Sequence, residues 1–213
     1  MVPTGLEIDR LVMSAWTDEA AAALTAARAL PVERGMPSAP PQPGLYAIHA
    51  EPQAWLELQL GEPPDQRPLY VGKSETSLAG RDIGTHFGYT ADTRTTSVTG
   101  GSTVRRSLAA LMHDSRGFRG VPRNMDKPGH FSNYGLTRDQ DTLLSEWMGD
   151  RLQLACWPLP GECGAPLEAI ERAIFRRLLP PLNLKDVATP WRPQIDTARR
   201  VMTAEARRWV AEQ

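Results

Sequence analysis

Two segments, GLYAIHA (residues 44–50) and RPLYVG (residues 67–72), decide the fold of this chain. Each contains a short apolar run beside glycine or proline, a pattern typical of a short β-strand. Residues 51–66 between them are too many for a tight hairpin turn, and they are predicted to include a short helix at about residues 53–60. The centre of the chain is therefore predicted to be a pair of strands joined by a long connection.

The rest of the chain is predicted to be mainly helical. Thr17 is placed to cap a first helix, and residues 137–140 (TRDQ) form a capping box that opens a later one. Pro166 lies in the first turn of a further helix, its preferred position. These patterns predict the α+β class, with helices over residues 17–30, 75–87, 102–113, 137–150, 166–179 and 193–212 and a third strand over residues 151–157.

The length and composition suit one domain with additions. The chain has 213 residues, of which 41% are hydrophobic, and no apolar run reaches the ~18 residues that span a bilayer. The N-terminus shows no signal-peptide pattern, and Cys156 and Cys163 lack the spacing of a zinc site. Two cysteines without a disulfide framework suit a reducing compartment, so we expect a cytoplasmic location without membrane contact.

Positive charge is concentrated in the middle of the chain. The net charge is −1, yet residues 101–138 carry seven basic side chains against two acidic ones, whereas residues 1–67 are acidic. One interpretation is a solvated surface. The other, which we favour, is a face that binds the phosphate backbone of a nucleic acid. The arginines predicted to bind it are Arg105, Arg106, Arg116, Arg119 and Arg123.

Together with a downstream segment, ERAIFRRLLPPLN (residues 171–183), the two strand segments resemble the GIY-YIG nuclease superfamily. Members of that family carry a tyrosine in each opening strand, then an arginine and often a histidine on the next helix. A later helix carries a glutamate and ends in proline and asparagine. The matching residues here are Tyr46, Tyr70, Arg81, His86, Glu171 and Asn183, with His86 five residues after the arginine where four is usual.

The resemblance implies a small β-sheet core flanked by helices, and the sequence pattern adds helical extensions at both ends. The nuclease-like domain would span residues 44–190 and include a basic insert at about residues 90–136. It would follow an N-terminal helix and proline-rich linker over residues 1–43. A C-terminal helix over residues 191–213 would complete the chain.

The resemblance also implies chemical roles. Tyr46 would act as the general base, and Tyr70 would position the phosphate or the attacking water. Because a free tyrosine has a pKa of about 10, a nearby cation such as Lys73 would have to lower it. Arg81 would hold two phosphate oxygens in a bidentate contact. Glu171 would be the protein ligand of one Mg²⁺ or Mn²⁺ ion.

Two further residues have less specific roles. His86 is a catalytic candidate, with a position on a helix surface as the alternative. Asn183 is expected to shape the wall of the site. Plain structural alternatives also exist for Tyr46 and Tyr70, which would pack in the core, and for Glu171, which would form an ion pair on its helix.

Two functions therefore stay open. The first is a metal-dependent DNA endonuclease, which the intact set of matched residues favours. The second is a non-cleaving module of the same fold that binds nucleic acid or a protein partner, which the overall acidity favours. No phosphate-binding GxxxxGK loop, GxSxG motif or HExxH motif occurs in the sequence to suggest a different chemistry.

Overall fold

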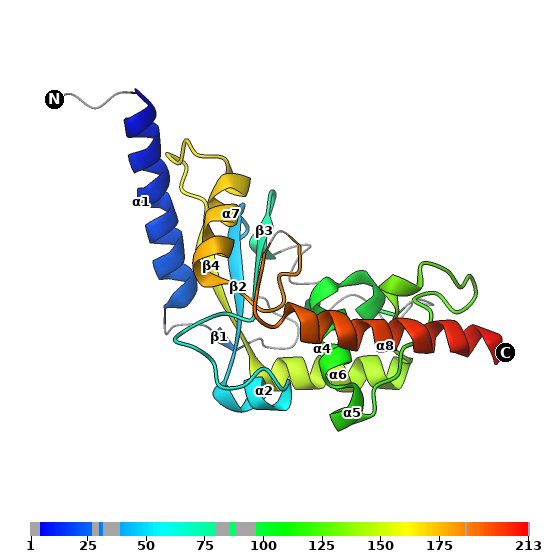
Figure 1. Cartoon of the computed structure of the whole chain (residues 1–213). Helices are drawn as coiled ribbons and strands as arrows, with labels where there is room; N and C mark the ends of the chain where they lie inside the picture. Colours follow the sequence, from blue (N-terminus) through cyan, green and yellow to red (C-terminus); the bar gives the residue numbers. More distant parts are fainter. Residues whose placement is uncertain are drawn as a thin grey trace.

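The chain folds around a small antiparallel sheet, and the predicted α+β class is confirmed (Figure 1). The computed structural model describes residues 5–26, 30–31, 39–79, 86–87, 97–185 and 187–212. The sheet has four strands in the order β1-β4-β2-β3. They are β1 (Leu30–Pro31), β2 (Gly44–Ala50), β3 (Tyr70–Ser74) and β4 (Leu152–Pro158).

Strand β2 lies inside the sheet and determines which side chains face each way. It pairs antiparallel with β3 on one side and with β4 on the other, so that Tyr46 lies opposite Gly72 of β3. Because successive side chains of a strand point to opposite faces, Leu45 and Ala47 face one side while Tyr46 and Ile48 face the other. All four side chains are buried. One strand thus contributes to two separate hydrophobic clusters.

One face of the sheet is covered by α1 (Gly5–Thr25) and α7 (Leu167–Leu178). Helix α1 begins well before the predicted cap at Thr17. The Thr17 hydroxyl instead donates to the Met13 carbonyl within the helix, at 2.8 Å. Leu24, near the end of α1, is completely buried in the cluster on this face. Helix α1 is therefore packed against the sheet.

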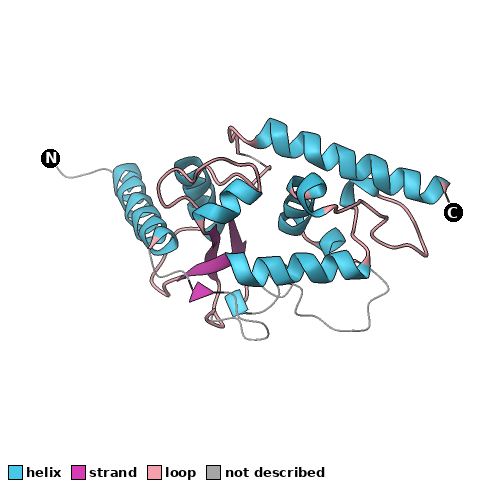
Figure 2. Ribbon diagram, turned by 90° about the horizontal axis from the view of Figure 1, so that it is seen from below, coloured by secondary structure: helices cyan, strands magenta, loops and turns pink. Residues whose placement is uncertain are grey.

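The opposite face carries the larger hydrophobic cluster and most of the other helices (Figure 2). These elements are α2 (Pro52–Glu57), the short 3₁₀ helix η2 (Thr99–Gly101), α4 (Thr103–Leu111), the short α5 (His113–Arg116), η3 (Phe131–Asn133), α6 (Arg138–Arg151) and α8 (Arg192–Ala211). Helix α4 lies between α6 and α8 and packs closely against α8.

The starts of α4 and α6 agree with the sequence pattern, although one predicted cap does not form. Helix α6 begins directly after Thr137, but the Thr137 side chain makes no capping hydrogen bond, so the predicted capping box does not form. Ser102 does cap α4, because its Oγ accepts the backbone N–H of Arg105 at 3.2 Å. This cap fixes the start of α4 beside the edge of the sheet.

Helix α8 covers the core as its sequence pattern predicts. Ile195, Met202 and Ala206 lie on one side of the helix and are completely buried. They belong to the larger cluster together with residues of α4. Within the described residues, neither α8 nor any other helix is long and apolar enough to cross a membrane.

Candidate active site

A cavity of about 570 Å³ opens where the end of β3 meets α7 and the start of α4. Five of the residues predicted to be catalytic line it, although they come from separate parts of the chain. Gly101 and Thr103 form part of its wall beside α4. Arg81, the sixth predicted catalytic residue, lies outside the described residues. The five that line the cavity are Tyr46, Tyr70, Lys73, His86 and Glu171.

The position of Tyr46 depends on the glycine that faces it across the sheet. Tyr46 is only 2% exposed, and its ring lies over Gly72 of β3. A Cβ atom at Gly72 would come within 2.5 Å of Tyr46 Cζ and Oη, which is closer than side chains pack. Glycine therefore provides the space in which the tyrosine ring lies, and this explains the glycine that ends the YVG segment.

His86 is buried against the two tyrosines. Its Nε2 lies 2.8 Å from Tyr46 Oη, and its Nδ1 lies 2.7 Å from Ser102 Oγ. The ring centroids of Tyr46, Tyr70 and His86 are 5.5–6.1 Å apart. Burial lowers the pKa of His86 to about 4, and the positive charge of Arg105 adds to the decrease. His86 is 8% exposed, so the alternative of a helix-surface position is wrong and the ring is neutral near pH 7.

Glu171 faces Lys73 across the cavity from the first half of α7. Burial raises the pKa of Glu171 to about 7; Lys73 opposes this rise, and Glu168 and Glu75 add to it. Lys73 Nζ lies 2.6 Å from Glu75 Oε1, and this contact raises the pKa of Lys73. Glu168 forms an ion pair with Arg172 one turn along the helix, at 2.6 Å. The Glu171 carboxylate has no such close partner in the described part of the chain.

The Glu171 carboxylate suits a hard divalent cation that keeps most of its bound water. No group of three or more histidine, cysteine, aspartate or glutamate side chains that could hold a metal occurs among the described residues. Mg²⁺ is commonly bound through one or two carboxylates together with water and substrate phosphates. A partly buried carboxylate whose pKa is raised gains from a nearby positive charge. Glu171 therefore fits the role of a single protein ligand.

Asn183 secures the edge strand of the sheet beside this cavity. Its side-chain amide bonds the backbone of Val71 in both directions: the Val71 N–H donates to Oδ1 at 2.9 Å, and Nδ2 donates to the Val71 carbonyl at 2.8 Å. Asn183 also lines a second cavity of about 380 Å³ that shares Tyr70, Lys73 and Glu171 with the first. The two cavities form one cleft along the edge of β3.

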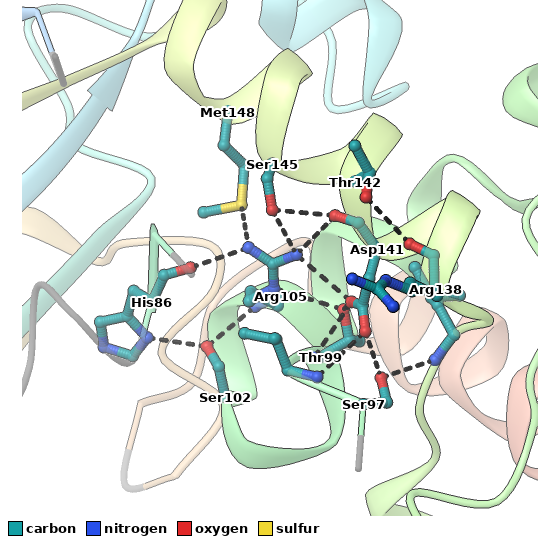
Figure 3. A network of polar contacts seen from close by, with 12 residues as sticks. His86, Ser97, Thr99, Ser102, Arg105, Arg138, Asp141, Thr142, Ser145 and Met148 are labelled. Carbon is teal, nitrogen blue, oxygen red and sulfur yellow. Dashed lines mark hydrogen bonds and ion pairs between the residues drawn. The ribbon is translucent and has the colours of Figure 1, made fainter. Parts of the chain in front are cut away.

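The prediction that Arg105 and Arg106 contact nucleic acid is wrong. Arg105 has no exposed surface, and its guanidinium donates to residues of α6 and forms an ion pair with Asp141 at 3.3 Å (Figure 3). Arg106 is 8% exposed and donates to the Gly100 carbonyl and to Thr103 Oγ1. Helix α4 lies between α6 and α8, so the charged side of its sequence pattern is covered by other helices.

The other three arginines predicted to bind nucleic acid are exposed. Arg116 forms an ion pair with Glu57 at 3.3 Å, and Arg119 lies 3.7 Å from Glu205. The Arg123 side chain instead packs over Gly100, and the next residue, Gly101, lines the cavity. Of these three exposed arginines, Arg123 is thus the one seen to pack beside the wall of the cavity.

Sequence reasoning missed two residues that support the site. Ser102 contacts His86, and Asp141 holds Arg105 behind it. Ser102 carried a detectable signal, because serine directly before an amphipathic helix is a typical cap. Asp141 carried none, since it lies 36 residues from Arg105 in the sequence.

Comparison with known proteins identifies one family. The model of the GIY-YIG catalytic domain matches residues 44–200, which is well over half of the chain. The match begins at β2 and ends within α8, so it includes every residue that lines the cavity. Neither the curated proteins nor the solved structures contain a match to the chain.

Proposed function

The chain belongs to the family of GIY-YIG catalytic domains, and from this premise we propose that it is a metal-dependent endonuclease that hydrolyses phosphodiester bonds in DNA. The observation that supports the proposal is the shared cavity of Tyr46, Tyr70, Lys73, His86 and Glu171. Phosphodiester hydrolysis needs a base, positive charge at the phosphate and stabilisation of the leaving oxygen. The residues of the cavity supply groups suited to these tasks.

Tyr46 is the proposed general base. Its hydroxyl oxygen would take a proton from the attacking water, which requires the phenolate form. The positive charge of Lys73 in the same cavity favours that form. Tyr70 lies with its ring 6.1 Å from that of Tyr46 and would position the water or the phosphate.

Glu171 would hold Mg²⁺ or Mn²⁺ through its carboxylate. Such an ion supplies charge neutralisation at the scissile phosphate. Arg81 is proposed to bind phosphate oxygens with its planar guanidinium. Asn183 keeps β3 in place, because it bonds the backbone of Val71 between Tyr70 and Gly72.

The test is cleavage of supercoiled plasmid DNA with Mg²⁺, with Mn²⁺ and with a chelator. We expect nicked or linear product only when the metal is present. Tyr46→Phe should lower the single-turnover rate by about 10²–10⁴-fold without weakening DNA binding, since it removes only the hydroxyl of the base. Glu171→Gln should remove detectable cleavage.

Tyr134→Phe is the matched control. Tyr134 is also buried, and its hydroxyl donates to the Arg106 carbonyl at 2.6 Å, but it does not line the cavity. This variant should cleave at the normal rate when folded. Binding of DNA without cleavage under every metal condition would contradict the proposal and would support a non-cleaving module.

A further inference from the structure

Ser102 joins the start of α4 to the imidazole of His86 (Figure 3). Its Oγ accepts the backbone N–H of Arg105 at 3.2 Å and lies 2.7 Å from His86 Nδ1. On the other side of the imidazole ring, His86 Nε2 lies 2.8 Å from Tyr46 Oη. A continuous line of hydrogen bonds therefore runs from the helix to the tyrosine proposed as the base.

The burial of Ser102 determines which way the protons point. A serine hydroxyl has one proton to donate and two lone pairs that accept. Ser102 is 1% exposed, and across the described ranges the hydrogen-bond partners of its Oγ are Arg105 and His86 alone. If His86 Nδ1 carried the ring proton, the Ser102 proton would be buried without an acceptor, which is unfavourable. The Ser102 hydroxyl therefore donates to Nδ1, and the ring proton lies on Nε2.

We propose that Ser102 is a positioning residue, which fixes the tautomer of His86 whose Nε2–H donates to Tyr46 Oη and so favours the anionic form of Tyr46. The inference rests on the proposed function, because it specifies how the base of that reaction is kept deprotonated. It also adds a residue that lies outside the motif positions of the family. Ser102 acts through His86 and touches no reacting atom.

The groups around the Ser102–His86–Tyr46 chain of hydrogen bonds favour the same direction of donation, from Ser102 toward Tyr46. The first turn of α4 places partial positive charge behind Ser102. Arg105 Nη1 donates to the His86 carbonyl at 3.2 Å, and its charge together with burial keeps the imidazole neutral. A neutral ring with its proton on Nε2 is a donor toward Tyr46. The titratable groups that share the cavity with Tyr46 are Tyr70, Lys73 and Glu75 from β3 and the turn after it, His86, and Glu171 from α7.

The first test is the pH dependence of single-turnover cleavage at saturating DNA. Ser102→Ala should move the pH at which the base loses its proton upward by about one, and should slow cleavage about tenfold below that pH. The affinity for DNA should not change. Ser102→Thr keeps a hydroxyl and should restore the normal profile.

Ser107→Ala is the matched control for this test. Ser107 is completely buried on the same helix, but its contact is with Arg199 at 3.4 Å and not with His86. Its pH profile should match that of the unmodified protein. A Ser102→Ala profile that also matches the unmodified protein would overturn the inference.

Nitrogen NMR of the imidazole tests the assignment without any cleavage. The unmodified protein should show the His86 proton on Nε2, and a proton on Nδ1 would overturn the inference. Because this measurement needs neither DNA nor a metal, it separates the two proposals. The expected tautomer in a protein that never cleaves DNA would contradict the nuclease function and would leave the Ser102–His86 hydrogen bond established.

Discussion

Two polar regions of this molecule meet at His86 and are built in opposite ways. Behind His86, the guanidinium of Arg105 is completely buried and donates to acceptors on η2, on α6 and on His86 itself. Asp141 accepts hydrogen bonds from Arg105 and from residues at the start of η2. In the cleft, by contrast, the Glu171 carboxylate accepts no hydrogen bond from any described residue, and burial raises its pKa to about 7.

The difference separates groups that hold the fold from groups that are available to a ligand. A buried ionic pair with good partners keeps neighbouring elements in one arrangement, and removing one partner leaves an uncompensated charge. A carboxylate that is partly buried and unpaired favours the arrival of a cation. The following predictions test this contrast, from the largest expected effect to the smallest.

Arg105→Met should cause the largest loss of stability. Methionine is an apolar side chain of similar length, so it fills much of the same space. It leaves the buried Asp141 carboxylate without its charged partner. We expect a decrease of about 3–5 kcal/mol in the free energy of unfolding. Urea denaturation measures it, and Arg119→Met, on an exposed arginine, should change stability by less than about 1 kcal/mol.

The double variant Arg105→Met with Asp141→Leu sharpens this prediction. It removes both charges, so it should recover part of the stability that the single variant loses. A single variant that is as stable as the original protein would show that the Arg105–Asp141 pair contributes little. The contrast between the two regions would then be wrong.

Gly72→Ala should have the next largest effect, and it acts at the boundary of the cleft. The added Cβ would lie within 2.5 Å of Tyr46 Oη, so the tyrosine ring or the strand must move. Overpacking of this kind costs about 1–3 kcal/mol of stability. Gly161→Ala is the control, because a Cβ at Gly161 has nothing within 4 Å.

The same variant should also lower the cleavage rate, because displacement of Tyr46 breaks its contact with His86. Cleavage at the normal rate by a destabilised Gly72→Ala protein would show that the position of Tyr46 is not needed for catalysis. Equal stability of the Gly72→Ala and Gly161→Ala proteins would show that the ring moves without strain.

Glu171→Gln should raise stability at alkaline pH, although it removes the proposed metal ligand. The pKa of Glu171 is about 7 in the folded protein, above the 4.5 of an ordinary glutamate, so the unfolded chain loses its proton first as the pH rises. Stability therefore falls as the pH rises from about 4.5 to 7 and stays lower above it. Glutamine has no proton to lose, and at pH 8 we expect a gain on the order of 1 kcal/mol for this partly exposed site.

Urea denaturation at acidic and alkaline pH, with and without Mg²⁺, measures this effect. Mg²⁺ should stabilise the original protein at alkaline pH and should not stabilise the Glu171→Gln variant. Glu168→Gln is the control, since Glu168 is paired with Arg172 on the same helix. A Glu171→Gln variant that is less stable at alkaline pH would mean that the carboxylate has a stabilising partner in the protein.

The sequence predicted the centre of the fold because its signals there are local. The short apolar run beside Gly44 predicts β2, and the apolar run after the long connection predicts β3. Strand β1 was not predicted, because Leu30–Pro31 is only two residues long and lies where prolines disfavour a ladder. The start of α1 was predicted too late in the sequence. Threonine is a typical helix cap, but Thr17 lies inside the helix.

The site could be predicted only as far as its motif extends. Tyr46, Tyr70 and Glu171 are found by the order and spacing of matched segments, and the structure brings all three to one cavity. The burial of Arg105 could not be predicted in this way. An arginine on the polar side of a helix is normally solvated, and its burial here depends on α6, which follows only later in the chain.

The contrast between groups that hold the fold and groups available to a ligand also exists among the arginines of residues 101–138, since some are buried and others are exposed. Arg123 is the exposed arginine that tests it. Within the described residues the Arg123 side chain has no hydrogen bond or ion pair, whereas the side chains of Arg116 and Arg119 are each close to a glutamate. Its side chain packs over Gly100, next to the Gly101 wall of the cavity. We therefore expect Arg123 to contact a phosphate of bound DNA.

Arg123→Gln should leave stability within about 0.5 kcal/mol of the original and reduce the slope of log affinity against log salt by about 0.9. Fluorescence titration of a DNA duplex at several salt concentrations measures the slope, and saturated single-turnover cleavage should change little. Arg208→Gln, the same change in the last turn of α8, is the control and should leave the slope unchanged. A slope that falls for Arg208→Gln and not for Arg123→Gln would place the DNA along α8, because counterion release follows the arginines that the phosphates contact.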